Sequence, residues 1–215
     1  MYEFGGPAQS AAQQLREALP LLSQQWERLD APIRTVLAPG ISPEEVDRLT
    51  EPHGLRVPVE VKALWEWHNG IAVDAQGHDF SIGPGRYEFL SVENALREYV
   101  GNRATHTREE AEVEQVSMDF WHSSWLPLFV AGSERLYVDC DRTVPGRAGS
   151  APVRLVSWEW EAYDVDVASS ILQAVRTWTW LLAQDFYRID FVHSRRMWQA
   201  DWAAIPLFLR VGGLA

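Results

Sequence analysis

The chain has 215 residues, with 19 basic and 30 acidic side chains, and carries a net charge of −11. This length fits one domain with at most an extension, and the acidic balance argues against nonspecific nucleic-acid binding, which needs a basic face. A single cysteine, Cys140, excludes an internal disulfide and a cysteine-rich zinc site, and it indicates a reducing compartment such as the cytoplasm. No signal peptide and no apolar run of membrane-spanning length is expected.

The charge is unevenly distributed along the chain. Residues 71–140 hold 12 acidic and 5 basic side chains, so −7 of the net charge lies there, whereas residues 185–215 are slightly basic. Such an acidic region is compatible with a basic protein partner. The alternative is that the negative charge only keeps the chain in solution.

The first part of the chain predicts three helices. Apolar residues at three- and four-residue spacing predict a helix over residues 8–30; they are Leu15, Leu19, Leu22, Trp26 and Leu29. Ser42, Pro43 and Glu45 form the pattern of a capping box and begin a short second helix. A third helix starts at Pro58, and Asn69-Gly70 predicts a left-handed turn at its end.

The second part of the chain predicts strands with one inserted helix. Tyr87–Leu90 is a short strand, and Ser91 caps the inserted helix. Residues 101–117, rich in glutamate, are predicted to form a solvated acidic insert. A hairpin is expected from Trp125–Val130 and Arg135–Val138, followed by a strand over Val153–Trp160 and a long helix over Val165–Phe186. This order predicts an α+β fold, with helices packed on one face of a central, mostly antiparallel sheet.

Several short sequence motifs occur along the chain in a distinctive order and spacing. They are Trp26, Leu37-x-Pro39-Gly40-x-Ser42-x-Glu44-Glu45, Leu55-x-x-Pro58, Leu64-Trp65-x-Trp67-His68-Asn69-Gly70, Phe89-Leu90-Ser91, Trp125-Leu126-Pro127-Leu128-Phe129, Leu136-x-Val138-Asp139, Pro152-Val153 and Ala168-Ser169-Ser170. Over roughly residues 20–185 the chain resembles the SMI1/KNR4 family of the SUKH superfamily. The resemblance implies a noncatalytic α+β protein. Bacterial members are implied to be immunity proteins against toxins, and fungal members to regulate cell-wall synthesis.

The end of the chain runs beyond this resemblance. We therefore expect one SMI1/KNR4-like domain over residues 1–185 and a C-terminal extension over residues 186–215. The extension contains Arg195-Arg196, Trp198, Trp202 and the apolar run Ile205–Leu209. It is expected to pack on the domain or on a partner, with a homodimer through this tail as one possibility.

The sequence offers little for catalysis. Gly83-Pro84-Gly85 lacks the residues of a phosphate-binding loop, and no two histidines have the spacing of a helical metal pair. Cys140 stands between Asp139 and Asp141, whose charges are expected to raise the pKa of its thiol. Glu159 and Glu161 fit the polar side of an amphipathic strand better than an acid/base pair. No catalytic residue, metal or cofactor is expected.

A protein-binding surface is the remaining hypothesis. We expect its contacts to come from acidic residues and tryptophans, since tryptophan is enriched among the residues that dominate binding. The expected contact residues are Glu110, Glu112, Glu114, Asp119, Asp139, Asp141, Glu159, Glu161, Trp67 and Trp121. Trp180, Trp198 and Trp202 also fall outside the apolar stripes, and the alternative is that all of these tryptophans pack the edges of the sheet. The expected partner is a basic toxin domain.

Overall fold

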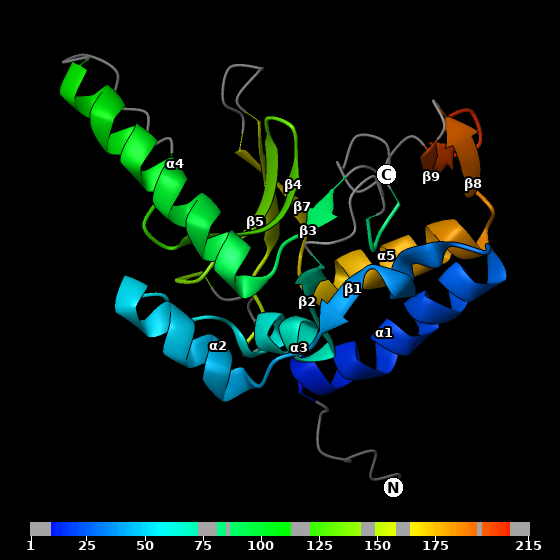
Figure 1. The fold of residues 1–215 in the computed structure, drawn as a ribbon, viewed down its shortest axis with the longest axis horizontal. Coiled ribbons are helices and arrows are strands. Elements are labelled where there is room, and N and C mark those ends of the chain that lie inside the picture. Colours follow the sequence, from blue (N-terminus) through cyan, green and yellow to red (C-terminus); the bar gives the residue numbers. More distant parts are fainter. Residues whose placement is uncertain are drawn as a thin grey trace, which may run out of the picture.

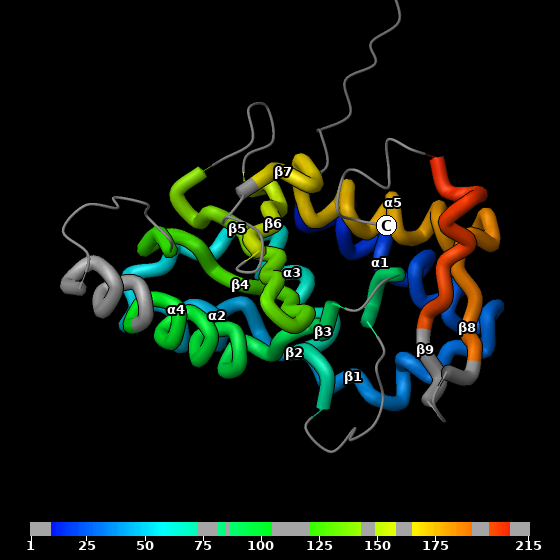
Figure 2. The backbone as a smooth tube through the Cα atoms, turned by 90° about the horizontal axis from the view of Figure 1, so that it is seen from above, coloured from blue at the N-terminus to red at the C-terminus, as the bar shows by residue number. Residues whose placement is uncertain are grey.

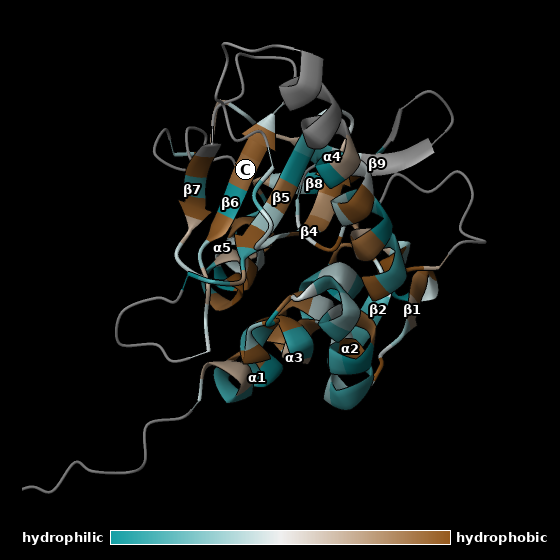
Figure 3. Ribbon diagram, turned by 90° about the vertical axis from the view of Figure 1, so that its left-hand side faces the viewer, coloured by the Kyte–Doolittle hydropathy of each residue, from teal (hydrophilic) through white to brown (hydrophobic). Residues whose placement is uncertain are grey.

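The computed structural model describes residues 10–72, 81–84, 87–112, 121–142, 149–157, 164–192 and 195–206. Helices α1 (Ala11–Arg28), α2 (Pro43–Thr50) and α3 (Val59–Trp67) lie together on one side of the molecule, and the main sheet lies on the other (Figures 1 and 3). Helix α5 (Ile171–Ala183) runs beside α1, while α4 (Val92–Glu112) flanks the sheet and projects away from it (Figure 1). The predicted α+β class is confirmed.

Within the described ranges, the main sheet has five antiparallel strands in the order β3-β4-β5-β6-β7. They are β3 (Glu88–Phe89), β4 (Trp125–Ala131), β5 (Glu134–Asp139), β6 (Val153–Ser157) and β7 (Asp164–Ala168). The predicted hairpin is therefore confirmed as β4 and β5. On the face toward α5, Phe129 meets Trp178 edge-on at 5.6 Å between ring centroids, so the core lies between the sheet and the helices.

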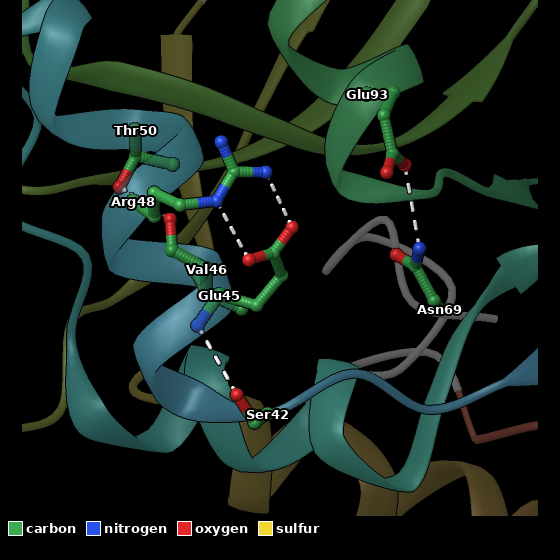
Figure 4. A network of polar contacts seen from close by, with 7 residues as sticks. All are labelled: Ser42, Glu45, Val46, Arg48, Thr50, Asn69 and Glu93. Atoms are coloured by element: carbon green, nitrogen blue, oxygen red, sulfur yellow. Dashed lines mark hydrogen bonds and ion pairs between the residues drawn. The ribbon is translucent and has the colours of Figure 1, made fainter.

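Helix α1 lies within the predicted range 8–30 and begins at Ala11, and α2 begins at Pro43 as predicted. Ser10 Oγ accepts a hydrogen bond from the Gln13 N–H at the start of α1, whose predicted apolar face is buried. Ser42 Oγ accepts from the Glu45 N–H at 3.2 Å, which confirms it as the cap of α2. In the expected capping box, the Glu45 carboxylate would also accept the backbone N–H of Ser42. It binds the Arg48 guanidinium instead (Figure 4).

The predicted left-handed turn that ends the third helix is wrong. Helix α3 ends at Trp67, and the next residues form strand β2 (His68–Ile71), which pairs with β1 (Leu37–Pro39). Gly70 does have a positive φ of 77°, but inside this strand, where a Cβ would lie 2.2 Å from the Ser91 nitrogen. Glycine is required there because the backbones of two segments approach closely.

Asn69 has a different role from the one expected. Its Oδ1 accepts the Val92 N–H at 2.9 Å. Its Nδ2 donates to Glu93 (Figure 4). Ser91 Oγ accepts the Asn94 N–H, as predicted for a cap. Two side chains therefore satisfy the first turn of α4, one adjacent in sequence and one brought from β2.

Two further boundaries differ from the sequence prediction. Residues 101–112 continue α4, so the acidic insert predicted over 101–117 is wrong for that part, and residues 113–117 lie outside the described ranges. The helix predicted from Val165 begins later. Alternating Asp and Val residues form strand β7 beside β6, and Ser170 then caps α5.

The C-terminal region forms a hairpin that the sequence reasoning did not anticipate. Strands β8 (Tyr187–Val192) and β9 (Arg195–Ala200) pair at the margin of the molecule, near α1 and α5 (Figure 2). The buried indole of Trp198 donates to the carbonyl oxygen of Ser81 at 3.1 Å. This contact fixes the hairpin to the segment Ser81–Pro84, all of which is buried.

Candidate protein-binding surface

Asp139 and Asp141 lie where β5 ends. Asp139 Oδ1 accepts the Ser124 hydroxyl at 2.5 Å and the Asp141 N–H at 3.1 Å, so this carboxylate organises the turn that follows the strand. Asp139 is partly buried, whereas Asp141 is exposed. Of the two side chains, Asp141 is the more exposed to solvent.

The cysteine between them is unsuited to nucleophilic chemistry. Burial and, to a smaller extent, the charges of Asp139 and Asp141 together raise the pKa of the Cys140 thiol to about 12. The predicted direction is confirmed, although burial is the larger cause. Since the thiolate is the reactive form, Cys140 stays an unreactive thiol at neutral pH.

The two expected tryptophan contacts are not equally placed. Trp121 is only 1% exposed, and its indole donates to the Trp125 carbonyl oxygen at 3.1 Å. The expectation that Trp121 reaches the surface is therefore wrong, because its ring packs against Trp125 and Tyr137. Trp67 is partly buried against Trp26 of α1, with 5.5 Å between ring centroids.

Two other tryptophans of the described residues are exposed to solvent. Trp180 of α5 is 42% exposed, and Trp202, just after β9, is 53% exposed. Trp198, which also falls outside the predicted apolar stripes, is buried. The sequence signals the exposure of Trp180, because this residue lies off the apolar stripe of its helix. It gives no such signal for Trp198 or Trp202.

Four neighbouring strand segments build a cluster of aromatic and charged side chains that the sequence reasoning missed. Trp125 and Tyr137 stack at 4.5 Å between centroids, and the Arg154 guanidinium lies 5.8 Å from the Trp125 ring. Arg154 Nε contacts Asp166 Oδ1 at 2.9 Å, and Arg142 binds the same carboxylate. The strand register places Tyr137 opposite Arg154 and Arg154 opposite Asp166, which no local sequence pattern reveals.

A group of carboxylates lies at the β3 edge of the sheet. Arg135 binds Glu98 of α4 at 2.9 Å, and the Tyr87 hydroxyl donates to Glu134. Burial raises the pKa of Glu88, and the charge of Glu98 adds to this rise. These acids come from three separate elements, and the prediction did not include them.

The remaining expected contacts are less completely described. Glu110 and Glu112 belong to the end of α4, but their side chains lie outside the described part of the structure. Glu114, Asp119, Glu159 and Glu161 also fall outside the described residues.

The described strands nevertheless bear on whether one surface can hold all of these acids. Strand β6 ends at Ser157 opposite Glu134, at the far end of β5 from Asp139. Those two ends of β5 are about 17 Å apart. The expected surface therefore has Asp139 and Asp141 at one end of the sheet, while the chain leads toward Glu159 from the other end.

Among the residues that the structure describes, no group of three or more His, Cys, Asp or Glu side chains is placed to hold a metal ion. Within the same ranges, no helix has the length and apolar character needed to cross a membrane.

Helices packed on a five-stranded antiparallel sheet, with Asn69 of β2 bonded to the first turn of α4, make the described residues an α+β fold. The chain belongs to the SMI1 / KNR4 family (SUKH-1), whose model matches residues 40–173. This family is generally noncatalytic. No curated protein matches the chain.

The residues that carry the family pattern have structural roles here. A Cβ on Gly40 would lie 1.8 Å from the Glu66 carbonyl oxygen, and the Trp65 indole donates to the Leu90 carbonyl oxygen at 3.0 Å. His68 Nδ1 lies 2.9 Å from the Ala38 carbonyl oxygen, so this side chain links β2 to β1. These residues of the family pattern therefore support the fold.

Proposed function

We propose that the chain is a noncatalytic protein-binding module, an immunity protein that binds and neutralises a bacterial toxin through an acidic, tryptophan-containing surface. Its membership of the SMI1 / KNR4 family carries this proposal. The net charge of −11, most of it within residues 71–140, supports a basic partner. The encounter takes place in the cytoplasm, where a lone thiol stays reduced.

The mechanism is occlusion of the toxin's working surface. A toxin that acts on nucleic acid needs a basic site for the phosphates, and an acidic inhibitor competes for that site. Long-range attraction between opposite charges speeds the encounter more than it strengthens the final complex. Exposed Asp141, with the acids around the end of α4, supplies this attraction in the proposal.

Two described groups that could otherwise do chemistry have structural tasks, which supports a noncatalytic role. The Asp139 carboxylate holds the turn after β5. Buried Glu60 accepts the Leu172 N–H at 2.6 Å and so helps to begin α5. The Cys140 thiol is protonated at neutral pH, as described above.

A regulatory or scaffold role without a toxin partner is the alternative within the same family. It is favoured if the chain binds a cellular protein but protects no cell from a toxin. Growth of cells that express a basic toxin domain, with and without this chain, separates the two. Rescue of growth supports the immunity role, and absence of rescue across toxins that the chain binds supports the regulatory one.

The acidic surface is tested by charge reversal once a bound toxin is in hand. Replacing Glu110, Glu112 and Glu114 by arginine is expected to weaken binding about tenfold or more and to reduce its dependence on salt. Asp141→Arg is a second probe at the end of β5. Glu44→Arg, on exposed α2, is the matched control. Unchanged affinity and salt dependence in the triple variant would show that the end of α4 is not the contact surface.

A further inference from the structure

Strand β8 has an edge with no strand beside it in the described structure. Among the described strands it pairs only with β9, and β8 is the outer strand of this hairpin at the margin of the molecule (Figures 1 and 2). The free edge of a sheet presents backbone N–H and C=O groups that another strand can pair with. An isolated two-stranded sheet is only marginally stable, so pairing with a further strand stabilises it.

The side chains along this edge are complementary to themselves. Arg188 and Asp190 are two residues apart, so they project from the same face of β8, with 75% and 51% of their side chains exposed. Within one chain, Arg188 Nε and Asp190 Oδ2 are 3.8 Å apart. An ion pair this exposed to solvent contributes little to stability. When two copies of β8 align antiparallel about Ile189, Arg188 of each copy faces Asp190 of the other. Symmetry thus makes two cross-strand ion pairs from two residues.

Other registers of the same pairing are unfavourable. A shift by two residues places Arg188 against Arg188, or Asp190 against Asp190, and like charges directly opposite destabilise a pair of strands. A shift by one residue places Ile189, which packs on the core, opposite Arg188, which points to solvent. The charges therefore select one alignment.

The hairpin is also held rigidly enough to serve as an interface. Tyr187 and Trp198 are buried, and the Trp198 indole is bonded to Ser81 of the main domain. An edge that is already ordered loses little conformational entropy on binding. Exposed Trp180 contacts Phe186, the residue directly before β8, with 5.3 Å between ring centroids, so apolar surface lies beside the edge.

We propose that a second copy of this chain pairs with β8 and forms a symmetric homodimer, with a four-stranded antiparallel sheet in the order β9-β8-β8-β9. This interaction is independent of the proposed toxin binding, because it uses the hairpin and not the acids near β5 and α4. A dimer would carry two copies of the toxin-binding surface. The failure of either proposal leaves the other standing.

Charge exchange tests the dimer directly, in sedimentation equilibrium of the full chain over a range of concentrations. The unmodified chain is expected to be a dimer. Arg188→Asp and Asp190→Arg each place like charges opposite one another twice, so each is expected to weaken dimerisation about tenfold to hundredfold. The double variant restores opposite charges and is expected to return to the dimer. Arg97→Asp, on exposed α4, makes the same charge change away from the edge and is the control.

The register is tested by cross-linking at the symmetry axis. Directly paired residues of antiparallel strands have Cα atoms about 4.5–5.5 Å apart, within the range of a disulfide, so Ile189→Cys is expected to form a covalent dimer under mild oxidation. The native thiol does not compete, since Cys140 is buried and its pKa is raised. A monomeric unmodified chain, or a dimer that neither single reversal weakens, overturns the proposal. A double variant that stays monomeric overturns it as well.

Discussion

The region matched by the family and the C-terminal hairpin are held in place by different kinds of contact. In the matched region, short-range side-chain bonds set the ends of the helices: Ser42, Ser91 and Ser170 each accept the N–H three residues later. The hairpin depends on Trp198, whose hydrogen-bond partner, Ser81, is 117 residues away. Local bonds specify where elements begin, while the distant bond specifies where an element sits.

The two regions are nevertheless interdependent. The segment Ser81–Pro84 lies inside the matched range, but its contacts with three tryptophans come from outside it. Trp26 donates to the Ile82 carbonyl oxygen at 3.0 Å, Trp198 donates to that of Ser81, and the Trp178 ring lies against Gly83. The matched residues alone would leave this buried segment without its support. The division predicted at residue 185 stays a prediction, and the Trp198 contact crosses it.

The largest effect is expected from Gly70→Ala in the matched region. An alanine there meets both an unfavourable φ of 77° and the Ser91 backbone, because its Cβ would lie 2.2 Å from that nitrogen. We expect a loss of about 3–5 kcal/mol in the free energy of unfolding, measured by chemical denaturation. Gly54→Ala has a similar φ of 72° but open space around the Cβ, so it should lose only about 1 kcal/mol. Equal losses would show that the close approach to Ser91 is unimportant.

The hairpin contact is tested by Trp198→Phe. This change keeps an aromatic ring but removes the N–H that satisfies the buried Ser81 carbonyl oxygen. The expected loss is about 2 kcal/mol in the free energy of unfolding, because a buried acceptor loses its partner and the ring shrinks. Trp202→Phe, at an exposed position, is the control and should change stability by less than about 0.5 kcal/mol. A negligible loss for Trp198→Phe would mean that the hairpin is only loosely attached.

The same contrast explains what the sequence could predict. The α1 and α2 helices, the Ser42 and Ser91 caps and the β4–β5 hairpin were predicted correctly because their signals are local. The strand at Asn69-Gly70 was missed because a glycine after a helix also fits a C-terminal turn, and only contact with Ser91 decides between them. The β8–β9 hairpin was missed because Trp198 reads as an isolated aromatic until its distant partner is known.

The candidate surface was harder to predict than the fold. The sequence identified candidate acids by their positions along the chain. It could not show that the Asp139 carboxylate accepts a hydrogen bond from the Ser124 hydroxyl or that Trp121 is buried. The cluster of Arg154 with Trp125 and Tyr137 also depends on strand register. Register is set by turns and packing across the sheet, so single-sequence patterns do not reveal it.

The start of α5 allows a local and a distant contact to be compared at one site. Ser170 Oγ accepts the Gln173 N–H, and Glu60 of α3 accepts the Leu172 N–H at 2.6 Å. Glu60→Gln keeps an acceptor oxygen but removes negative charge from the helix N-terminus, so a loss of about 1 kcal/mol is expected. Ser170→Ala should lose about 1 kcal/mol as well. Thermal unfolding of both variants and of their combination measures this, and a neutral Glu60→Gln would assign the start of α5 to Ser170 alone.

The smallest effect, opposite in sign, is expected from Glu88→Gln at the β3 edge. Burial and the charge of Glu98 raise the pKa of Glu88, so the folded chain binds its proton more tightly than the unfolded chain does. Stability linked to this proton is present at low pH and is lost as pH rises through the raised pKa. Removing the charge should therefore stabilise the protein at about pH 7 by a few tenths of a kcal/mol. The value is small because the burial of Glu88 is only partial and solvent still reaches the side chain.

The sign of this effect distinguishes Glu88 from an ordinary surface acid. The stabilisation should disappear at about pH 4, where the carboxyl of the unmodified chain is largely protonated. Melting temperatures of the two chains at both pH values measure this difference, and Glu51→Gln, at an exposed position directly after α2, is the matched control. A destabilised Glu88→Gln variant at about pH 7 would mean that the carboxylate makes a favourable contact that outweighs its burial and the repulsion from Glu98. In that case the charge of Glu88 would stabilise the β3 edge through an attractive contact of the same kind as the Arg135–Glu98 ion pair beside it.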